Sequence, residues 1–96
     1  MDELTRLREE IDSIDKELVS IFERRMEVSA RIGEVKRIMG SCILDAEREK
    51  EVLESRKGYL KNAALLPYWE KEVKTLIELS KDYQWTLRED SLSLKK

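Results

Sequence analysis

One cation interrupts an apolar stripe in the first part of the chain and a second lies on the same helix face, where the two could bind an anion. Apolar residues recur with heptad spacing at positions 4, 7, 11, 14, 18, 21, 28, 32, 35 and 39, and this register calls for another at position 25. Arg25 stands there instead, and Lys36 follows 11 residues later. On a helix this separation is three turns plus about 20°, so the cations share a face about 16 Å apart. Both side chains could reach one small anionic ligand.

The residues between the two cations suit such a pocket. Ser29 is small and leaves room, and Ile32 would form an apolar floor. The alternative is structural, because an arginine can pack its stem along a helix seam while its head reaches solvent or a neighbouring carboxylate. The pattern of Arg25 and Lys36 on one face favours the anion site.

Polar residues also interrupt an apolar side near the C-terminus. Ser80 and Gln84 are spaced i,i+4 on the side that otherwise carries four apolar residues, Leu76, Ile77, Tyr83 and Leu87. A serine hydroxyl can bond to its own helix backbone, so Ser80 alone indicates little. An inward amide without a partner is costly, so Gln84 predicts a polar partner inside the fold.

Asp45, Arg48 and Glu49 form a third group of candidates. Their i, i+3 and i+4 spacing puts them on one face at the expected start of a helix. Such a group is ordinarily a surface salt-bridge cluster. A helix N-terminus also offers free backbone N–H groups, so the same residues could bind a polar ligand.

Arg8 follows the seam residues Leu4 and Leu7 and occupies a flanking heptad position, where charged residues usually guide helix pairing. It precedes Arg25 by 17 residues, or about 25 Å along one helix. The two arginines cannot hold one small ligand from the same chain. If both serve one site, two antiparallel chains must build it.

Composition limits the classes of function. The 96 residues suit one domain, and 19 Lys plus Arg against 21 Asp plus Glu give no basic field for nucleic acid or a membrane surface. No apolar run approaches a membrane span or a signal peptide, which predicts a cytoplasmic protein. Cys42 is the only cysteine and histidine is absent, which excludes an internal disulfide and argues against zinc sites and Cys/His nucleophiles. We expect no cofactor and no metal.

The elements that would position these residues are three helices in an all-α fold. Residues 3–39 contain no proline, and Gly40 stands where a helix C′ residue belongs. Asp45 is a suitable N-cap for a second helix over about 45–61. Pro67 suits the first turn of a third helix over about 67–88, followed by a frayed tail at 89–96. Residues 1–96 are expected to form a single domain.

The length of the first helix predicts a dimer. A helix over 3–39 would be about 55 Å long, whereas a compact chain of this size is only about 32 Å across. The helix would therefore overhang its own domain and leave its apolar seam in water. We expect a homodimer, an intertwined helical bundle in which a second chain covers that seam.

The chain resembles the all-helical chorismate mutases from about Leu4 to Leu87. The resemblance rests on five fragments in family order, Leu7-Arg8-Glu9-x-Ile11-x-x-Ile14-Asp15, Glu23-Arg24-Arg25, Val35-Lys36, Asp45-x-x-Arg48-Glu49 and Ser80-x-x-x-Gln84. The family spacing is kept except for a slightly short connection before the third helix. The residues that break the apolar patterns are the same residues that carry the resemblance.

The resemblance implies a site for chorismate, a dianion, and its Claisen rearrangement to prephenate in aromatic amino acid biosynthesis. Arg25 and Arg8 of the partner subunit would hold the two carboxylates, while Lys36 and Gln84 would hydrogen-bond the ether oxygen. This unimolecular reaction needs no nucleophile and no net proton transfer. It relies on a held near-attack geometry and on preorganised donors.

The remaining site residues are also implied by the resemblance. Glu49, which joins Lys36, Gln84 and Arg25 as a catalytic residue, would receive the ring hydroxyl together with the Asp45 region. Arg48 and Ser80 would orient these groups and the substrate.

Two other functions remain open at this stage. The first is an isochorismate pyruvate lyase of the same fold, although Asp45-x-x-Arg48-Glu49 resembles the mutases more closely. The second is a non-catalytic helical dimerisation module, although a purely structural seam would do better with Leu or Ile in place of Arg25. Turnover of chorismate or isochorismate, and ligand binding, would discriminate among the three.

Overall fold

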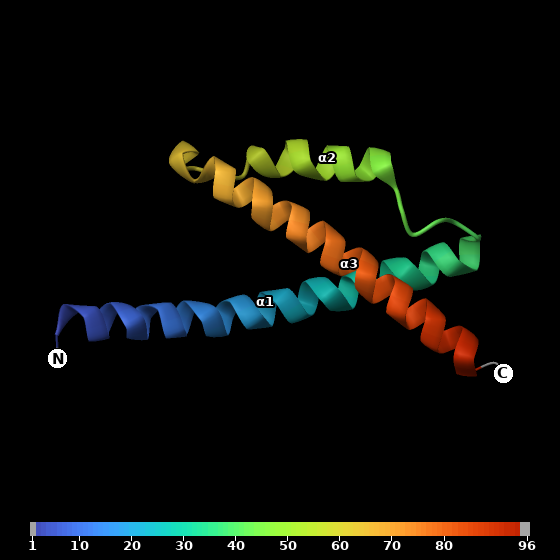
Figure 1. The fold of residues 1–96 in the computed structure, drawn as a ribbon, viewed down its shortest axis with the longest axis horizontal. Coiled ribbons are helices and arrows are strands. Elements are labelled where there is room, and N and C mark those ends of the chain that lie inside the picture. The colour runs from blue at the N-terminus through green and yellow to red at the C-terminus, as the bar shows by residue number, and fades with distance from the viewer. Residues whose placement is uncertain (1, 95–96) are drawn as a thin grey trace.

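The computed structural model describes the backbone of residues 2–94 and the side chains of residues 2–90. Over this range the chain forms three α-helices and one short 3₁₀ helix, with no strand (Figure 1). The elements are α1 (Glu3–Met39), α2 (Ala46–Lys57), η1 (Ala63–Leu65) and α3 (Leu66–Leu94). The diagonal helix α3 crosses α1 and also packs against α2 (Figure 1). The prediction of an all-α fold with one very long helix is confirmed.

Both ends of α1 are set by the residues that flank it. The Asp2 carboxylate accepts a hydrogen bond from the backbone N–H of Thr5 at 2.7 Å, which caps the first turn. Gly40 adopts a left-handed conformation with φ of 71°, and the N–H of Ser41 donates to the carbonyl of Lys36 at 2.8 Å. The predicted range of 3–39 matches the observed helix.

The second helix is shorter than the sequence predicted. Asp45 caps it as expected, because its carboxylate accepts from the N–H of Arg48 at 3.0 Å. The helix ends at Lys57, before Gly58, rather than at residue 61. The indole N–H of Trp69 donates to the carbonyl of Arg56 at 2.8 Å, so a contact from α3 satisfies the last turn of α2.

The third helix is longer than predicted at both ends. It begins at Leu66, after the Asn62 side chain has accepted a hydrogen bond from the N–H of Ala64 at 3.0 Å. It continues to Leu94, so the predicted frayed tail is wrong for residues 89–94, whereas 95 and 96 lie outside the described residues. No glycine or proline follows Pro67 in the sequence, and nothing there stops a helix.

The buried core is small and lies between α2 and α3. Val52 of α2 packs with Val73 and Ile77 of α3, and Leu53 and Trp69 flank this cluster. By contrast, the apolar seam of α1 is largely uncovered. The exposed fractions of its first five members lie between 50% and 57%: Leu4, Leu7, Ile11, Ile14 and Leu18.

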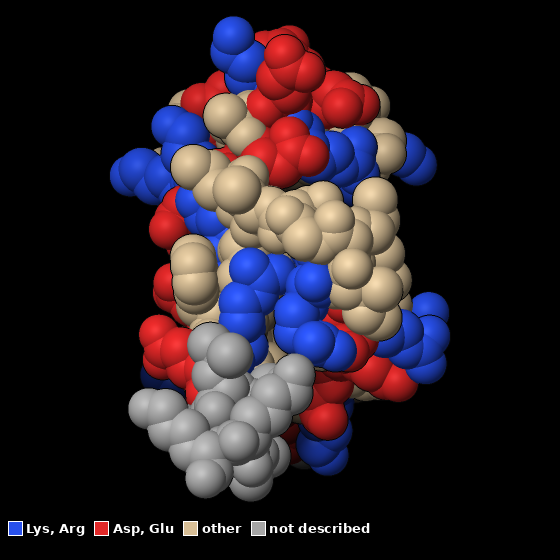
Figure 2. All heavy atoms as spheres, turned by 90° about the vertical axis from the view of Figure 1, so that its right-hand side faces the viewer, with Lys and Arg blue, Asp and Glu red and all other residues tan. Residues whose placement is uncertain are grey.

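The molecule is elongated because the N-terminal part of α1 extends beyond the other helices (Figure 1). Its dimensions are 58 × 30 × 15 Å and its radius of gyration is 17.3 Å, against about 12.5 Å for a compact chain of this length. On the face seen in Figure 2, acidic and basic side chains are interspersed, and neither sign of charge covers the face. Within the described residues, no helix combines the length and apolar content that a bilayer crossing requires.

Candidate active site

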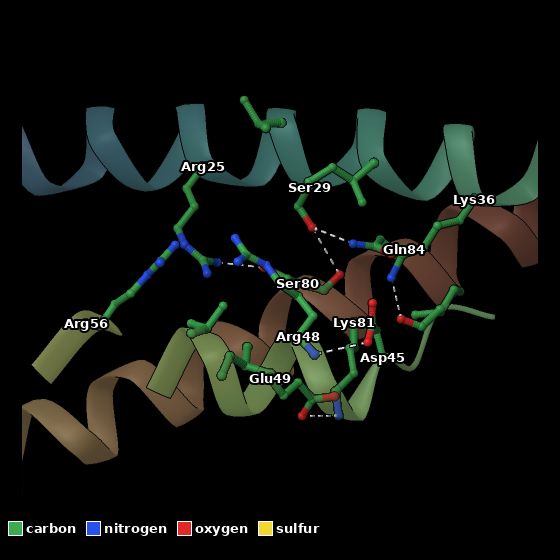
Figure 3. Close-up of a pocket in the computed structure, with 15 residues that line it drawn as sticks. Arg25, Ser29, Lys36, Asp45, Arg48, Glu49, Arg56, Ser80, Lys81 and Gln84 are labelled. Atoms are coloured by element: carbon green, nitrogen blue, oxygen red, sulfur yellow. Dashed lines mark hydrogen bonds and ion pairs between the residues drawn. The ribbon is translucent and has the colours of Figure 1, made fainter. Parts of the chain in front are cut away.

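One cavity of about 340 Å³ opens among the three helices and the loop after α1 (Figure 3). Seven of the eight site residues predicted from the sequence line it: Arg25, Lys36, Asp45, Arg48, Glu49, Ser80 and Gln84. Ser29 and Ile32, the small residue and the apolar floor, line it as well. The eighth residue, Arg8, does not. The structure therefore gathers onto one surface most of the residues that broke the apolar patterns.

Arg25 reaches from α1 to α3 across the cavity. Its Nη1 donates to the carbonyl of Leu76 at 3.1 Å and to the Ser80 hydroxyl at 2.6 Å. Desolvation by burial lowers the pKa of Arg25, and the positive charge of Arg56 lowers it further. Within residues 2–90 no carboxylate pairs with it. The arginine is not snorkelling to solvent or to a seam carboxylate, and its remaining donors are available to a ligand.

Lys36 lies at the other end of the same face of α1. Its Nζ donates to the backbone carbonyl of Ile43 at 2.7 Å. Ile43 is almost fully buried, so this carbonyl is a fixed anchor in the loop that precedes α2. An ammonium has three donors, and in the described part of the chain no carboxylate neutralises this one. The loop therefore orients a charged donor toward the cavity.

Gln84 and Ser29 connect α3 to α1 at the wall of the cavity. The Gln84 amide donates through Nε2 to the Ser29 hydroxyl at 3.0 Å, and that hydroxyl donates to the carbonyl of Ser80 at 3.3 Å. Only 7% of Gln84 and 4% of Ser29 are exposed. The Oε1 of Gln84 is buried and accepts no hydrogen bond from a described residue. Such an oxygen is costly to bury without a partner, so the amide is one polar group that a ligand could satisfy.

Gly33 allows α1 to approach Gln84 this closely. A Cβ at position 33 would lie 2.8 Å from the Cγ of Gln84 and 3.2 Å from its Cβ. Glycine is needed here because the space for a methyl group is already filled by the glutamine stem.

We expect Gly33→Ala to destabilise the protein by about 1–3 kcal/mol, because overpacking displaces the neighbouring side chain. Urea unfolding measures this loss. Turnover should fall as well, since the displaced side chain is Gln84. Ala30→Gly, one turn away on the same helix, changes size in the opposite direction without that clash and controls for helix propensity. Unchanged stability and turnover in Gly33→Ala would contradict the close approach.

Asp45, Arg48 and Glu49 do not pair with one another through their side chains. Asp45 caps α2 through a backbone N–H, and Arg48 pairs with the exposed Glu51 at 3.6 Å. Glu49 places Oε1 3.4 Å from the Nζ of Lys81, while its Oε2 is buried and accepts no hydrogen bond from a described residue. The surface salt-bridge cluster that the spacing allowed is therefore not formed. A half-paired carboxylate faces the cavity in its place.

Two basic residues that line the cavity, Arg56 and Lys81, were not predicted. Arg56 lies seven residues after Glu49, and Lys81 lies four residues after Ile77, so each shares a helix face with a lining residue. The charge of Lys81 is stabilised by two carboxylates: hydrogen bonding to Glu78 at 2.9 Å is the main cause of its raised pKa, and Glu49 adds to it. Helical spacing is the sequence signal for both residues, but it does not by itself separate the side chains that face the cavity from those that face solvent.

The charges that line the cavity are mainly positive. Five cations and two carboxylates contribute to its wall, a formal excess of three positive charges: Arg25, Lys36, Arg48, Arg56 and Lys81 against Asp45 and Glu49. Partial burial strengthens such a field relative to open solvent. The arrangement suits a small anionic ligand. Among the described residues, no three acidic or cysteine side chains come together as metal ligands would.

Arg8 lies apart from the cavity, on the N-terminal part of α1 that extends beyond the other helices (Figure 1). Its side chain is exposed, as are its neighbours in the seam. The structure of one chain therefore does not bring Arg8 to the other site residues, in agreement with the separation computed from the sequence.

Comparisons with known proteins identify the family. The sequence model of the family described as chorismate mutase type II matches residues 7–85. The T-protein of Enterobacter agglomerans is 47% identical over 55 residues, which cover 57% of this chain and 15% of that protein. The intracellular chorismate mutase of Mycobacterium tuberculosis is 42% identical over 52 residues, which cover 54% of this chain and 50% of that protein. The chain thus spans half or less of these curated relatives.

A solved structure gives the same result for the fold. A conserved hypothetical protein from Pyrococcus furiosus superposes with a TM-score of 0.66 at 36% sequence identity, covering 88% of this chain and 97% of that one. The family match reaches all three helices and includes all 15 residues that line the cavity, from Arg25 to Gln84. The chain belongs to the chorismate mutase type II family.

Proposed function

We propose that this chain catalyses the rearrangement of chorismate to prephenate, a step in the biosynthesis of phenylalanine and tyrosine. The observation that carries the proposal is the convergence of Arg25, Lys36 and Gln84 on one cavity. Glu49 lines the same cavity from α2. A family member that lacked the activity would have no need to hold unpaired cations and a buried amide together, because these groups are costly in a purely structural role.

The reaction breaks the ether C–O bond of the substrate as a new C–C bond forms, without a nucleophile or a net proton transfer. Negative charge develops on the ether oxygen in the transition state. Lys36 and Gln84 would direct donors at that oxygen, and these donors are already fixed by Ile43 and Ser29. Donors that need no reorganisation stabilise the transition state more than the ground state.

The other residues would hold the substrate in its reactive conformation. Arg25 would bind one carboxylate and Arg8 of the partner subunit the other, while Glu49 and the Asp45 region would receive the ring hydroxyl. The buried Oε2 of Glu49 accepts no hydrogen bond from a described residue and is available for that hydroxyl. Arg48 would orient these groups. Holding the enolpyruvyl arm over the ring removes much of the entropic barrier.

A homodimer with shared sites is part of this proposal. The uncovered apolar seam on α1 supports it, because a free chain would leave a long row of half-exposed leucine and isoleucine side chains in water. Each chain would work as one domain. A cytoplasmic location fits the printed name of the mycobacterial relative, an intracellular chorismate mutase.

Subunit complementation tests the shared sites. Arg8→Ala and Lys36→Ala homodimers should each be almost inactive. After mixed refolding, about half of the dimers would contain one chain of each kind, and one of their two sites would have both residues, so about a quarter of the original turnover should return. Arg6→Ala, two residues from Arg8, serves as the matched control and should keep its activity. No recovery in a verified heterodimer would contradict the contribution of the partner chain.

Turnover and calorimetry with the two compounds distinguish the two alternative functions. If the folded protein converts isochorismate to salicylate and pyruvate but leaves chorismate unchanged, it is a lyase. If it binds neither compound in calorimetry, the cavity has no such role and the chain is a dimerisation module.

A further inference from the structure

Arg56 is a basic residue of the cavity wall to which the function proposed above gives no role, and unlike Lys81 it has no carboxylate partner among the described residues. It projects from the last full turn of α2, while Arg25 projects from α1 on the opposite wall, and Figure 3 shows the two side chains pointing toward one another. We propose that Arg56 binds the same substrate carboxylate as Arg25, so that two guanidinium groups of one chain enclose it. This inference rests on the proposed function, because it assumes a ligand with carboxylates.

The position of Arg56 is fixed by its surroundings. Its carbonyl accepts the indole N–H of Trp69 at 2.8 Å, which ties this turn of α2 to α3. Its Nη1 donates to the Ser55 hydroxyl at 2.8 Å, and its guanidinium lies 5.5 Å from the centre of the Tyr59 ring. These contacts hold the side chain against the wall but use only part of its five donors.

The two arginines face each other without an acid between them. Within residues 2–90 no carboxylate forms an ion pair with Arg25 or Arg56. The acids of the cavity wall are used elsewhere, since Asp45 caps α2 and Glu49 pairs with Lys81. The charge of Arg56 is one of the causes that lower the pKa of Arg25, so the two groups interact electrostatically.

An anion between the two guanidinium groups would attract both and offset their mutual repulsion. A carboxylate has two oxygens and about four acceptor positions, so it can accept from two guanidinium groups at once. Arg25 has already committed Nη1 to Leu76 and Ser80 on α3. Its other donors and those of Arg56 approach the same space from opposite helices. The arrangement suits a carboxylate rather than the ether oxygen, which the proposed function assigns to Lys36 and Gln84.

The role predicts a change in binding rather than in the chemical step. Arg56→Met keeps an unbranched stem and removes the charge, and KM for chorismate should rise about tenfold or more, as expected for one charge-assisted hydrogen bond. The change in kcat should stay within about threefold, because the carboxylate carries its charge in both ground and transition states. Arg56→Lys should recover part of the binding. Lys50→Met removes the same charge from an exposed position on α2 and should leave KM unchanged.

A purely structural role would give a different set of results. Arg56→Met removes the positive charge that faces Arg25. The thermal midpoint of the ligand-free variant should therefore equal or exceed that of the unmodified protein. If both arginines bind one carboxylate, the loss of affinity in the Arg25→Met, Arg56→Met double variant should differ from the product of the single losses. Unchanged KM in Arg56→Met, or a lowered midpoint with kcat and KM changed together, would overturn the inference.

Turnover and binding assays of the unmodified protein distinguish a failure of this inference from a failure of the proposed function. If it forms prephenate and Arg56→Met has the same KM, only the role of Arg56 fails. If it forms no prephenate, the proposed function fails, and calorimetry with chorismate then decides on Arg56 through the dissociation constants of the two proteins. Absence of any binding by the unmodified protein would overturn both.

Discussion

Replacing Lys36 by alanine should lower kcat by about 10²–10³-fold, the usual effect of removing one preorganised donor from a developing negative charge. The Nζ of Lys36 is held 2.7 Å from the carbonyl of Ile43 and has donors left for the ether oxygen. The variant should stay folded, because the group removed is a partly solvated ammonium rather than a core residue. Steady-state kinetics with chorismate, with circular dichroism and sedimentation on the same samples, measures both effects.

Lys50→Ala is the matched control for this prediction. Lys50 lies on an exposed face of α2 and carries the same charge outside the cavity. Its variant should retain the original kcat, which separates loss of the directed donor from a change in overall charge. Near-normal turnover in a folded Lys36→Ala protein would remove this lysine from the mechanism.

Replacing Gln84 by glutamate should make turnover depend on pH, with faster turnover at acidic pH. The amide donates at any pH, whereas a carboxylic acid donates only when protonated. Burial at a position where glutamine is 7% exposed would raise the pKa of the new carboxyl, and Lys36 and Arg25 would oppose that rise. At about pH 7.5 turnover should fall by about 10²-fold, and it should increase as the pH is lowered through the pKa of the new carboxyl.

The pH profile of kcat measures this effect directly. The unmodified protein should show no sharp change between about pH 6 and 8, because the Gln84 amide is neutral and donates without first being protonated. Gln84→Met, which lacks a donor at every pH, should be slow throughout. A profile of Gln84→Glu as flat as that of the unmodified protein would contradict a donor role for this residue.

The helix boundaries that the sequence predicted well are those with a local chemical cause. Asp2 and Gly40 set α1, because one caps the first turn and the other adopts a left-handed conformation after the last. The end of α2 was missed: the helix ends before Gly58, whose N–H donates to the carbonyl of Ser55, and Trp69 of α3 bonds to the carbonyl of Arg56 in the same turn. The end of α3 was misplaced because nothing in the sequence after Pro67 stops a helix.

The site residues that could be predicted are polar residues at positions where burying a polar group costs free energy. Arg25 and Gln84 occupy positions that the apolar pattern reserves for other residue types, and each has a defined partner in the fold. Arg56 and Lys81 were missed because their spacing from the predicted residues does not separate a side chain that faces the cavity from one that faces solvent. Only the packing of α2 and α3 makes that distinction. The role of Arg8 is still a prediction that needs a second chain.

The most direct test of the central claim is a time course of the purified protein with chorismate, following loss of the substrate's ultraviolet absorbance and identifying the product by mass spectrometry and nuclear magnetic resonance. The account predicts stoichiometric prephenate from the unmodified protein and almost none from Lys36→Ala. No prephenate from a folded, dimeric protein would contradict it.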